Sequence, residues 1–338
     1  KLRRYEAVTL SCLAVMTVLA LVGNTFFNYQ PSAVGILKDM VAFFKMPITL
    51  LAGLKVMKRI DDAPMQAAVN LSRVFLTVLF LFGILSLFVD MGMSHGVRRG
   101  IPAFKFLYSH PTYLVYVVVL MVVCIVAHGV KKLDYLFLLE AVAVLILTQR
   151  DKGFAFVALL LVVVLFLRGN RDIKLWHLIL VAVAALAISL KKILDYASWS
   201  WSAREAMYGA GLQLMLQCFP LGSGFATFGN SLSGEYYSGV YELFGLNEKP
   251  GLNPIDYVNL SDAQWPYYMG QFGVLGMLVF LVMLGYLFLI VRKRYLGNMQ
   301  QVKAVYLIAG YLMVASLVET VFTNESGVTA MIIMLVFL

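Results

Sequence analysis

Residues 267–291 read YYMGQFGVLGMLVFLVMLGYLFLIV, a long run without one charged side chain. A helix of about 20 apolar residues, rising 1.5 Å per residue, crosses a hydrocarbon layer of about 30 Å. This run therefore predicts a membrane-spanning helix. The rest of the chain is similar, because 61% of its 338 residues are hydrophobic and 13% are charged, against roughly 25% charged in soluble domains. We expect an all-α integral membrane protein.

Other apolar runs of similar length follow one another along the sequence. We predict membrane helices at 5–27, 33–57, 67–89, 111–130, 133–149, 153–168, 175–191, 267–291, 304–320 and 327–338. The last run is too short to span, and the sequence begins without Met, so we expect the natural protein to extend beyond one or both ends. The predicted architecture is one polytopic helical bundle over 1–338, with about ten or more transmembrane helices and a large extracytoplasmic loop at 191–266.

Basic residues predict the orientation. Lys1, Arg3 and Arg4 precede the first apolar run, which lacks a small-residue cleavage site and is therefore a retained helix with a cytoplasmic N-terminus. The net charge of +9 belongs to this topology, and we expect no nucleic acid as a partner. The sequence contains no Walker loop, HExxH helix or metal-spaced cysteines, so we expect no cofactor and no metal.

The stretch before the opening run breaks the hydrophobic pattern. Residues 221–266 are polar and rich in Gly and Tyr. An irregular segment cannot lie against lipid, because its backbone groups would have no partners, so this one is an aqueous loop or lines a wet cavity. Gly222, Gly224 and Gly229 would allow a tight turn and a close approach of the backbone to a ligand. We expect the chemistry here and around it.

Two arginines are candidates for binding an anion. Arg150 lies in LTQRDKGFAF, a short polar turn between two predicted helices. It either snorkels to the interface or, together with Lys152, holds a pyrophosphate, because a guanidinium can contact two oxyanion oxygens at once. Arg204 lies in a predicted helix that begins at Ser202, where Ser202 and Glu205 have the capping-box pattern. A cation in the first helical turn indicates either a bound anion or a salt bridge with Glu205 or another carboxylate.

The helix around Arg204 has four candidates for a buried face, and the region after it has a candidate base and several aromatic rings. The face residues are Met207, Leu212, Leu214 and Met215. Ser261 or Asp262, in SDAQWPYYMG, could be the N-cap of the following helix. Alternatively, Asp262 is a base that accepts a proton from a sugar hydroxyl. Exposed tyrosine and tryptophan rings suit either sugars or the membrane interface. The candidate glycan-binding residues are Tyr236, Tyr237, Tyr241, Trp265 and Tyr268.

Charged residues within predicted spans need partners. Lys38 and Lys45 are two helical turns apart and share a face. Lys45 falls near mid-membrane, which favours either a wet cavity that supports pyrophosphate or an ion pair, with Asp39 and Glu140 as candidate partners. Arg73 is close enough to the cytoplasmic end to snorkel.

The run 220–276 resembles Wzy-type polysaccharide polymerases of the O-antigen ligase and polymerase superfamily. The resemblance rests on the turn GSGFATFG, the cluster YYSxxY at 236–241 and the entry SDxxWPxxxGxxG into a span, while LTQRDKGF at 147–154 is similar to that group's span-turn-span arginine. It covers about a third of the chain.

The resemblance implies a GT-C-like glycosyltransferase in the bacterial inner membrane, with its active site facing the periplasm. Such enzymes transfer a glycan from undecaprenyl pyrophosphate to another lipid-linked repeat unit, with inversion and without a metal. Arg150 and Arg204 would stabilise the leaving pyrophosphate, and Asp262 would assist the acceptor hydroxyl. A polysaccharide co-polymerase that regulates chain length is an implied partner.

Two other functions remain open at this point. The related ligases typically have a histidine in the late outer loop, and this sequence has none after His177, which favours a polymerase over a ligase. A lipid-linked glycan transporter or flippase is the alternative of a different class, with Lys45 and Glu140 along a route.

Overall fold

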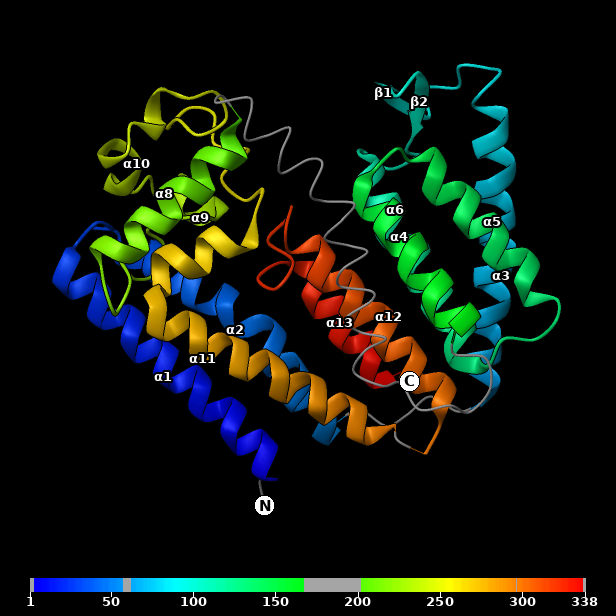
Figure 1. Cartoon of the computed structure of the whole chain (residues 1–338), viewed down its shortest axis with the longest axis horizontal. Helices are drawn as coiled ribbons and strands as arrows, with labels where there is room; N and C mark the ends of the chain where they lie inside the picture. Colours follow the sequence, from blue (N-terminus) through cyan, green and yellow to red (C-terminus); the bar gives the residue numbers. More distant parts are fainter. Residues whose placement is uncertain (1–2, 57–61, 167–201, 296, 337–338) are drawn as a thin grey trace. The chain divides into compact units, whose positions relative to one another are not determined.

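The computed structural model describes residues 3–56, 62–166, 202–295 and 297–336 (Figure 1). A helix stands at each predicted span within these residues, whereas the predicted span 175–191 lies outside them. Among the described residues, four helices are long and apolar enough to cross a membrane: Arg4–Phe27, Ala63–Leu85, Pro111–His128 and Gln264–Arg294. The chain is therefore mostly helical and has the character of a membrane protein, while the count of about ten spans stays a prediction.

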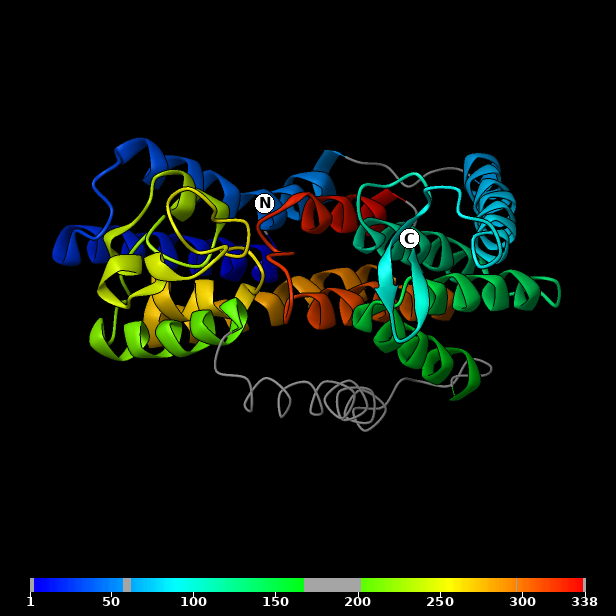
Figure 2. The same ribbon diagram turned by 90° about the horizontal axis from the view of Figure 1, so that it is seen from above.

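The chain forms two compact units. Unit 1 comprises the described residues within Lys1–Lys55, Lys192–Ile290 and Ala315–Met331, and unit 2 those within Val56–Lys191, Val291–Val314 and Ile332–Leu338. Unit 1 is built mainly from α1 (Arg4–Phe27), α2 (Ala33–Val56), α8 (Ala203–Gln217), α9 (Ser231–Glu235), α10 (Gly239–Leu243), the 3₁₀ turn η2 (Leu246–Glu248), most of α11 (Gln264–Arg294) and the start of α13 (Glu325–Val336). Figure 2 shows the same helices from above.

Unit 2 contains the remaining elements. They are α3 (Asp62–Leu85), β1 (Ser94–Arg98), β2 (Ile101–Phe104), α4 (Pro111–His128), α5 (Asp134–Leu147), α6 (Asp151–Leu161), the π-helical turn η1 (Val162–Phe166) and most of α12 (Met299–Ala315). α3 packs against α4 and α5. The antiparallel pair β1–β2, in which Arg98 faces Ile101, departs from the all-α prediction.

Arg73 of α3 does not snorkel. Its guanidinium forms an ion pair of 2.7 Å with Asp134 at the start of α5, and the Asp134 side chain is 1% exposed. Glu140, predicted as a partner of Lys45, instead accepts a hydrogen bond of 2.8 Å from the Thr77 hydroxyl. Both carboxylates therefore join helices within unit 2.

A kink divides α11. Gly273 has φ 61° and ψ −163°, a conformation that is not helical and that almost only glycine adopts. The break leaves the carbonyls of Gly270 and Gln271 without their usual partners, and they accept hydrogen bonds of 2.9 Å from the N–H groups of Ser223 and Gly224. A buried backbone group that has lost its helical partner must find another partner in the protein. The glycine-rich turn therefore supplies the hydrogen bonds that α11 loses at its kink.

The glycine-rich turn is a buried part of unit 1, with every residue from 222 to 230 buried. Gly222 and Gly224 have φ of 86° and 99°, and a Cβ on either would collide with protein backbone, at Gly273 for Gly222 and at Asn24 for Gly224. The expected close approach to a ligand is thus wrong for these two positions. Their glycines are required because helices α1 and α11 pack directly against the turn.

Candidate active site

Helix α8 presents Arg204 at its N-terminus. Ser202 is the N-cap and its side chain accepts a hydrogen bond from the Glu205 N–H, which confirms the predicted cap. The buried residues of the helix are Met207, Ala210, Gly211 and Leu214. Leu212 is 48% exposed, so the predicted buried face is wrong at that position.

Arg204 contacts Asp262 at two points. Its Nε donates to the Asp262 backbone carbonyl at 3.0 Å, and its Nη2 lies 3.3 Å from the carboxylate oxygen Oδ2. Of the two explanations that the sequence allowed for Arg204, the structure shows the salt bridge. Its partner is Asp262 rather than Glu205. The two contacts fix both the backbone and the side chain of Asp262 relative to α8.

Asp262 is not the N-cap of α11, because the helix begins at Gln264. Burial raises the pKa of the Asp262 carboxyl, with Glu319 acting in the same direction and Arg204 in the opposite one. A raised pKa makes the carboxylate a better proton acceptor near neutral pH. Because its side chain remains 42% exposed, a substrate hydroxyl can reach it.

The aromatic candidates separate into accessible and buried rings. Tyr241 and Tyr268 are 0% and 1% exposed, the hydroxyl of Tyr241 contacts Ser233, and Tyr268 stacks on Phe280. They support the core, and the expectation that they are exposed is wrong. Tyr236, Tyr237 and Trp265 are partly exposed, and these three rings stay candidates for glycan contact.

The two lysines of α2 have different surroundings. Lys38 forms an ion pair of 2.8 Å with Glu235 and lies over the Tyr236 ring. Lys45 is exposed, and among the described residues no ion pair of its ammonium is found. Its predicted partner Asp39 is fully buried and binds the glycine-rich turn instead. The predicted pairing of Lys45 is therefore wrong.

Arg150 of unit 2 contacts a histidine that precedes α4. Its Nη2 lies 2.8 Å from Nε2 of His110, and the His110 ring meets His95 edge to face at 4.9 Å. Burial lowers the pKa of His110 to about 4, and the positive charges of Arg150, His95, Lys152 and Arg98 add to the shift. A neutral His110 can accept a hydrogen bond from the guanidinium, which is always a donor.

Two further cations belong to this cluster. Lys152 is 5% exposed and acts on His110 electrostatically. Arg99, at the β1–β2 turn, forms an ion pair of 2.7 Å with Asp151, the first residue of α6. The cluster of His95, Arg98, Arg99, His110, Arg150 and Lys152, called here the cationic cluster, therefore carries more positive than negative charge. Such a group of donors suits an oxyanion.

The predicted residues form two sets. Arg204 and Asp262 meet in unit 1, and Arg150 and Lys152 lie together in unit 2. The meeting of Arg150 with Arg204 around one diphosphate stays a prediction. Within the described residues, no group of three or more His, Cys, Asp or Glu could hold a metal ion.

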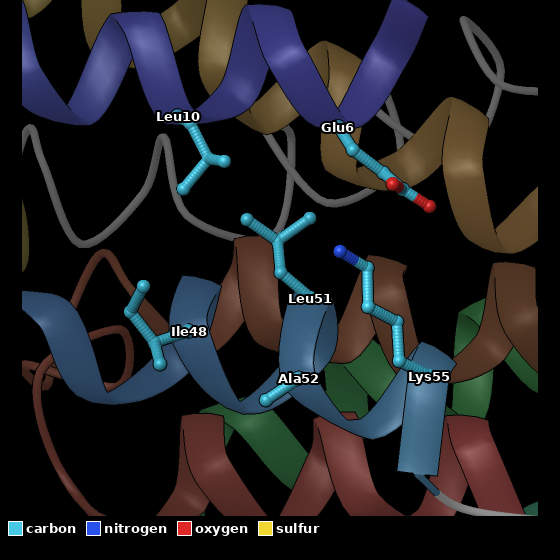
Figure 3. A pocket seen from close by; sticks show the side chains of 6 residues that line it. All are labelled: Glu6, Leu10, Ile48, Leu51, Ala52 and Lys55. Carbon is cyan, nitrogen blue, oxygen red and sulfur yellow. The ribbon is translucent and has the colours of Figure 1, made fainter. Parts of the chain in front are cut away.

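A groove between α1 and α2 of unit 1 contains none of these residues. Its volume is about 200 Å³, with Leu10, Ile48, Leu51 and Ala52 as its apolar lining. Figure 3 shows Glu6 and Lys55 pointing into it from opposite helices at one end. Glu6 and Lys55 lie at the ends of α1 and α2 remote from Asn24 and Asp39, which hold the glycine-rich turn.

Sequence reasoning missed His110 and the true partners of Asp39. His110 lies 40 residues before Arg150, and only its position just before a Pro at a helix start marked it as a possible cap. Asp39 carried a signal, since a carboxylate in an apolar run needs partners. Its partners were unknown because they lie about 190 residues away.

A comparison with protein-family models found no family that matches this chain, and a comparison with curated proteins found no significant match.

Proposed function

We propose that this protein polymerises lipid-linked oligosaccharide repeat units by inverting, metal-independent glycosyl transfer. The observation that carries the proposal is the Asp262 carboxylate, which is partly exposed, held by Arg204 and raised in pKa by burial. A general base needs an accessible carboxylate whose pKa lies closer to the working pH than that of free Asp.

In the proposed step, the acceptor hydroxyl oxygen bonds to the anomeric carbon of the donor. The bond from that carbon to the phosphate oxygen breaks, and the diphosphate leaves with the bonding electrons. The hydroxyl proton passes to Asp262. Arg204 acts as a positioning residue, because it holds both the backbone carbonyl and the carboxylate of Asp262.

The cationic cluster supports a diphosphate as the leaving group. Arg150 and Lys152 supply positive charge, and neutral His110 orients the guanidinium of Arg150. Preorganised cations stabilise charge that develops on a leaving group and need no metal for this. The partly exposed rings of Tyr236, Tyr237 and Trp265 are the proposed glycan contacts.

The proposal includes a GT-C-like fold in the bacterial inner membrane with the site facing the periplasm. Donor and acceptor are both undecaprenyl-pyrophosphate-linked glycans, and a chain-length regulator is a proposed partner. The many apolar helices support a membrane location, and an enzyme embedded in a membrane can reach lipid-linked substrates directly.

Purified protein in liposomes with the lipid-linked repeat unit as sole substrate tests the proposal. We expect a ladder of products, lost about 100-fold or more in Asp262→Asn, since general-base catalysis contributes on this scale. Asp256→Asn, the same substitution at an exposed carboxylate of unit 1, is the matched control and should keep the ladder. No ladder from the repeat unit alone, together with transfer once a different glycan acceptor is added, would indicate a ligase. Donor movement across the bilayer without a new glycosidic bond would indicate a flippase. Either result would overturn the proposal.

A further inference from the structure

Helix α8 has an exposed apolar face that its core contacts do not use. Leu212 and Leu216 of α8 are 48% and 63% exposed, and Phe219, two residues past the end of the helix, is 65% exposed. Gln213 and Gln217 are exposed beside them. Leu212 and Leu216 share one face, because residues four apart stack on a helix. No charged residue occurs from 206 to 221, whereas a helix that faces water normally carries charges on its outer side.

The opposite face of α8 is held against the first turns of α11. Gly211 lies so close to Pro266 that an added Cβ would meet its Cα at 3.2 Å, and Leu214 would similarly meet a Cβ at Gly270 at 3.1 Å. In Figure 1, α8 and the first part of α11 lie side by side. Because the two helices are in contact, the position of α11 relative to the membrane also sets the depth of α8 in it.

The kink of α11 indicates where the hydrocarbon begins. The whole helix has 31 residues and would measure about 46 Å, much more than the hydrocarbon thickness of about 30 Å. The apolar part after Gly273, residues 274–291, would measure about 27 Å, close to that thickness, and Arg292, Lys293 and Arg294 follow it. This part also exposes Leu275, Leu278, Leu281 and Val282. This length match favours a hydrocarbon boundary near Gly273 rather than at residue 267, where the apolar run begins.

The two ends of α8 lie at different levels along α11. At its N-terminus Arg204 contacts Asp262, which precedes α11. Just beyond its C-terminus the Pro220 carbonyl accepts a hydrogen bond of 3.3 Å from the N–H of Leu275, two residues past the kink. Helix α8 therefore runs from the polar start of α11 at its N-terminus to the edge of the hydrocarbon at its C-terminus. Its exposed leucines lie in the C-terminal half.

We propose that α8 is an interfacial helix whose exposed Leu212 and Leu216, together with Phe219 just past its end, insert into the boundary between phospholipid headgroups and acyl chains. The approach of the end of α8 to Leu275 and the continuity with a membrane span favour lipid over a protein partner. The inference concerns the membrane contact alone and does not depend on the proposed activity.

Site-directed spin labelling in liposomes of phosphatidylethanolamine and phosphatidylglycerol tests this. Single cysteines replace Leu212, Leu216 or Phe219, with Glu248 in the outer segment as the water reference and Leu278 as the lipid reference. The three native cysteines are buried, and labelling of the unchanged protein measures their background. Collision rates with oxygen, which dissolves in lipid, and with a water-soluble nickel chelate are recorded at each position.

We expect the labels at 216 and 219 to collide with the nickel chelate several-fold less often than the label at 248, and with oxygen about as often as the label at 278. Nickel collisions equal to those at 248 would place this face in water. Protection from both reagents would mean that protein covers it, either another segment of this chain or a second copy. Both results would overturn the inference, and labels at three positions guard against one label that disturbs the helix.

Discussion

The Asp39 carboxylate of α2 accepts a hydrogen bond of 2.6 Å from the backbone N–H of Ala226. The same carboxylate accepts from the side-chain amide of Asn230 at 2.6 Å and from the Tyr267 hydroxyl at 3.2 Å. One buried side chain therefore joins α2, the glycine-rich turn and the start of α11.

Replacing Asp39 with Leu should destabilise unit 1 by about 3 kcal/mol or more, because several buried donors lose their acceptor at about 1–3 kcal/mol each. Asp39→Asn should cost less, since one oxygen remains. Thermal unfolding in detergent measures both, with Lys45→Leu on the same helix as the control, since Lys45 is exposed. An unchanged midpoint in Asp39→Leu would contradict the structural role.

Gly273→Ala should destabilise the protein by about 1–3 kcal/mol, the cost of placing a side chain in a backbone region reserved for glycine. The contact of Gly273 with the backbone of Gly222 adds to this cost. Gly285→Ala is the control in the same helix, because a Cβ there meets nothing within 4 Å. That control should be neutral or stabilising by up to about 1 kcal/mol. Thermal unfolding in detergent measures both variants, and equal unfolding midpoints would contradict the kink at Gly273.

His110 should make stability depend on pH. Its pKa is lowered to about 4 in the folded protein, against about 6.5 in an unfolded chain. Between these values the unfolded chain binds more protons, so stability is complete above pH 6.5 and declines as the pH falls toward 4. The unfolding midpoint of the wild type should therefore fall more between pH 7 and 5 than that of His110→Gln. If the unfolding midpoints of the wild type and His110→Gln changed with pH in parallel, the lowered pKa of His110 would be contradicted.

The Arg204–Asp262 pair should have a small coupling energy. Its side chains are 24% and 42% exposed, and partly exposed pairs contribute roughly 0.2–1 kcal/mol. A double-mutant cycle with Arg204→Ala and Asp262→Ala, followed by thermal unfolding, measures the coupling. A value well above this range would mean that the pair mainly holds the fold together, which would weaken its assignment to catalysis.

Two ion pairs of different burial provide a contrast. Removing Arg73 leaves the buried Asp134 carboxylate without its ion-pair partner, and such a loss costs about 3–5 kcal/mol. Lys38 and Glu235 are 48% and 46% exposed, so Lys38→Ala should cost about 1 kcal/mol or less. Chemical or thermal unfolding of Arg73→Ala and Lys38→Ala tests the order, and a reversed order would be inconsistent with the observed burial.

Local sequence patterns predicted the helices well, because apolar length and caps such as Ser202 depend on neighbouring residues. Long-range partners were not predictable in this way. The sequence marked Asp39 as needing a partner but favoured nearby Lys45, whereas the actual partners come from the turn at 226–230. The burial of Tyr241 and Tyr268 was missed for a related reason, since tyrosine in a polar stretch suits a surface and a core equally.

The hydrogen bond between the Ala226 N–H and the Asp39 carboxylate also affects how the protein is inserted into the membrane during synthesis. The two residues are 187 positions apart. The ribosome therefore completes α2 well before it synthesises the residues that donate hydrogen bonds to Asp39. During that interval Asp39 has none of its native donors, and a carboxylate in hydrocarbon is costly. The insertion machinery must therefore keep α2 shielded or hydrated until residues 226–230 arrive, which makes the native assembly of unit 1 a late event in translation.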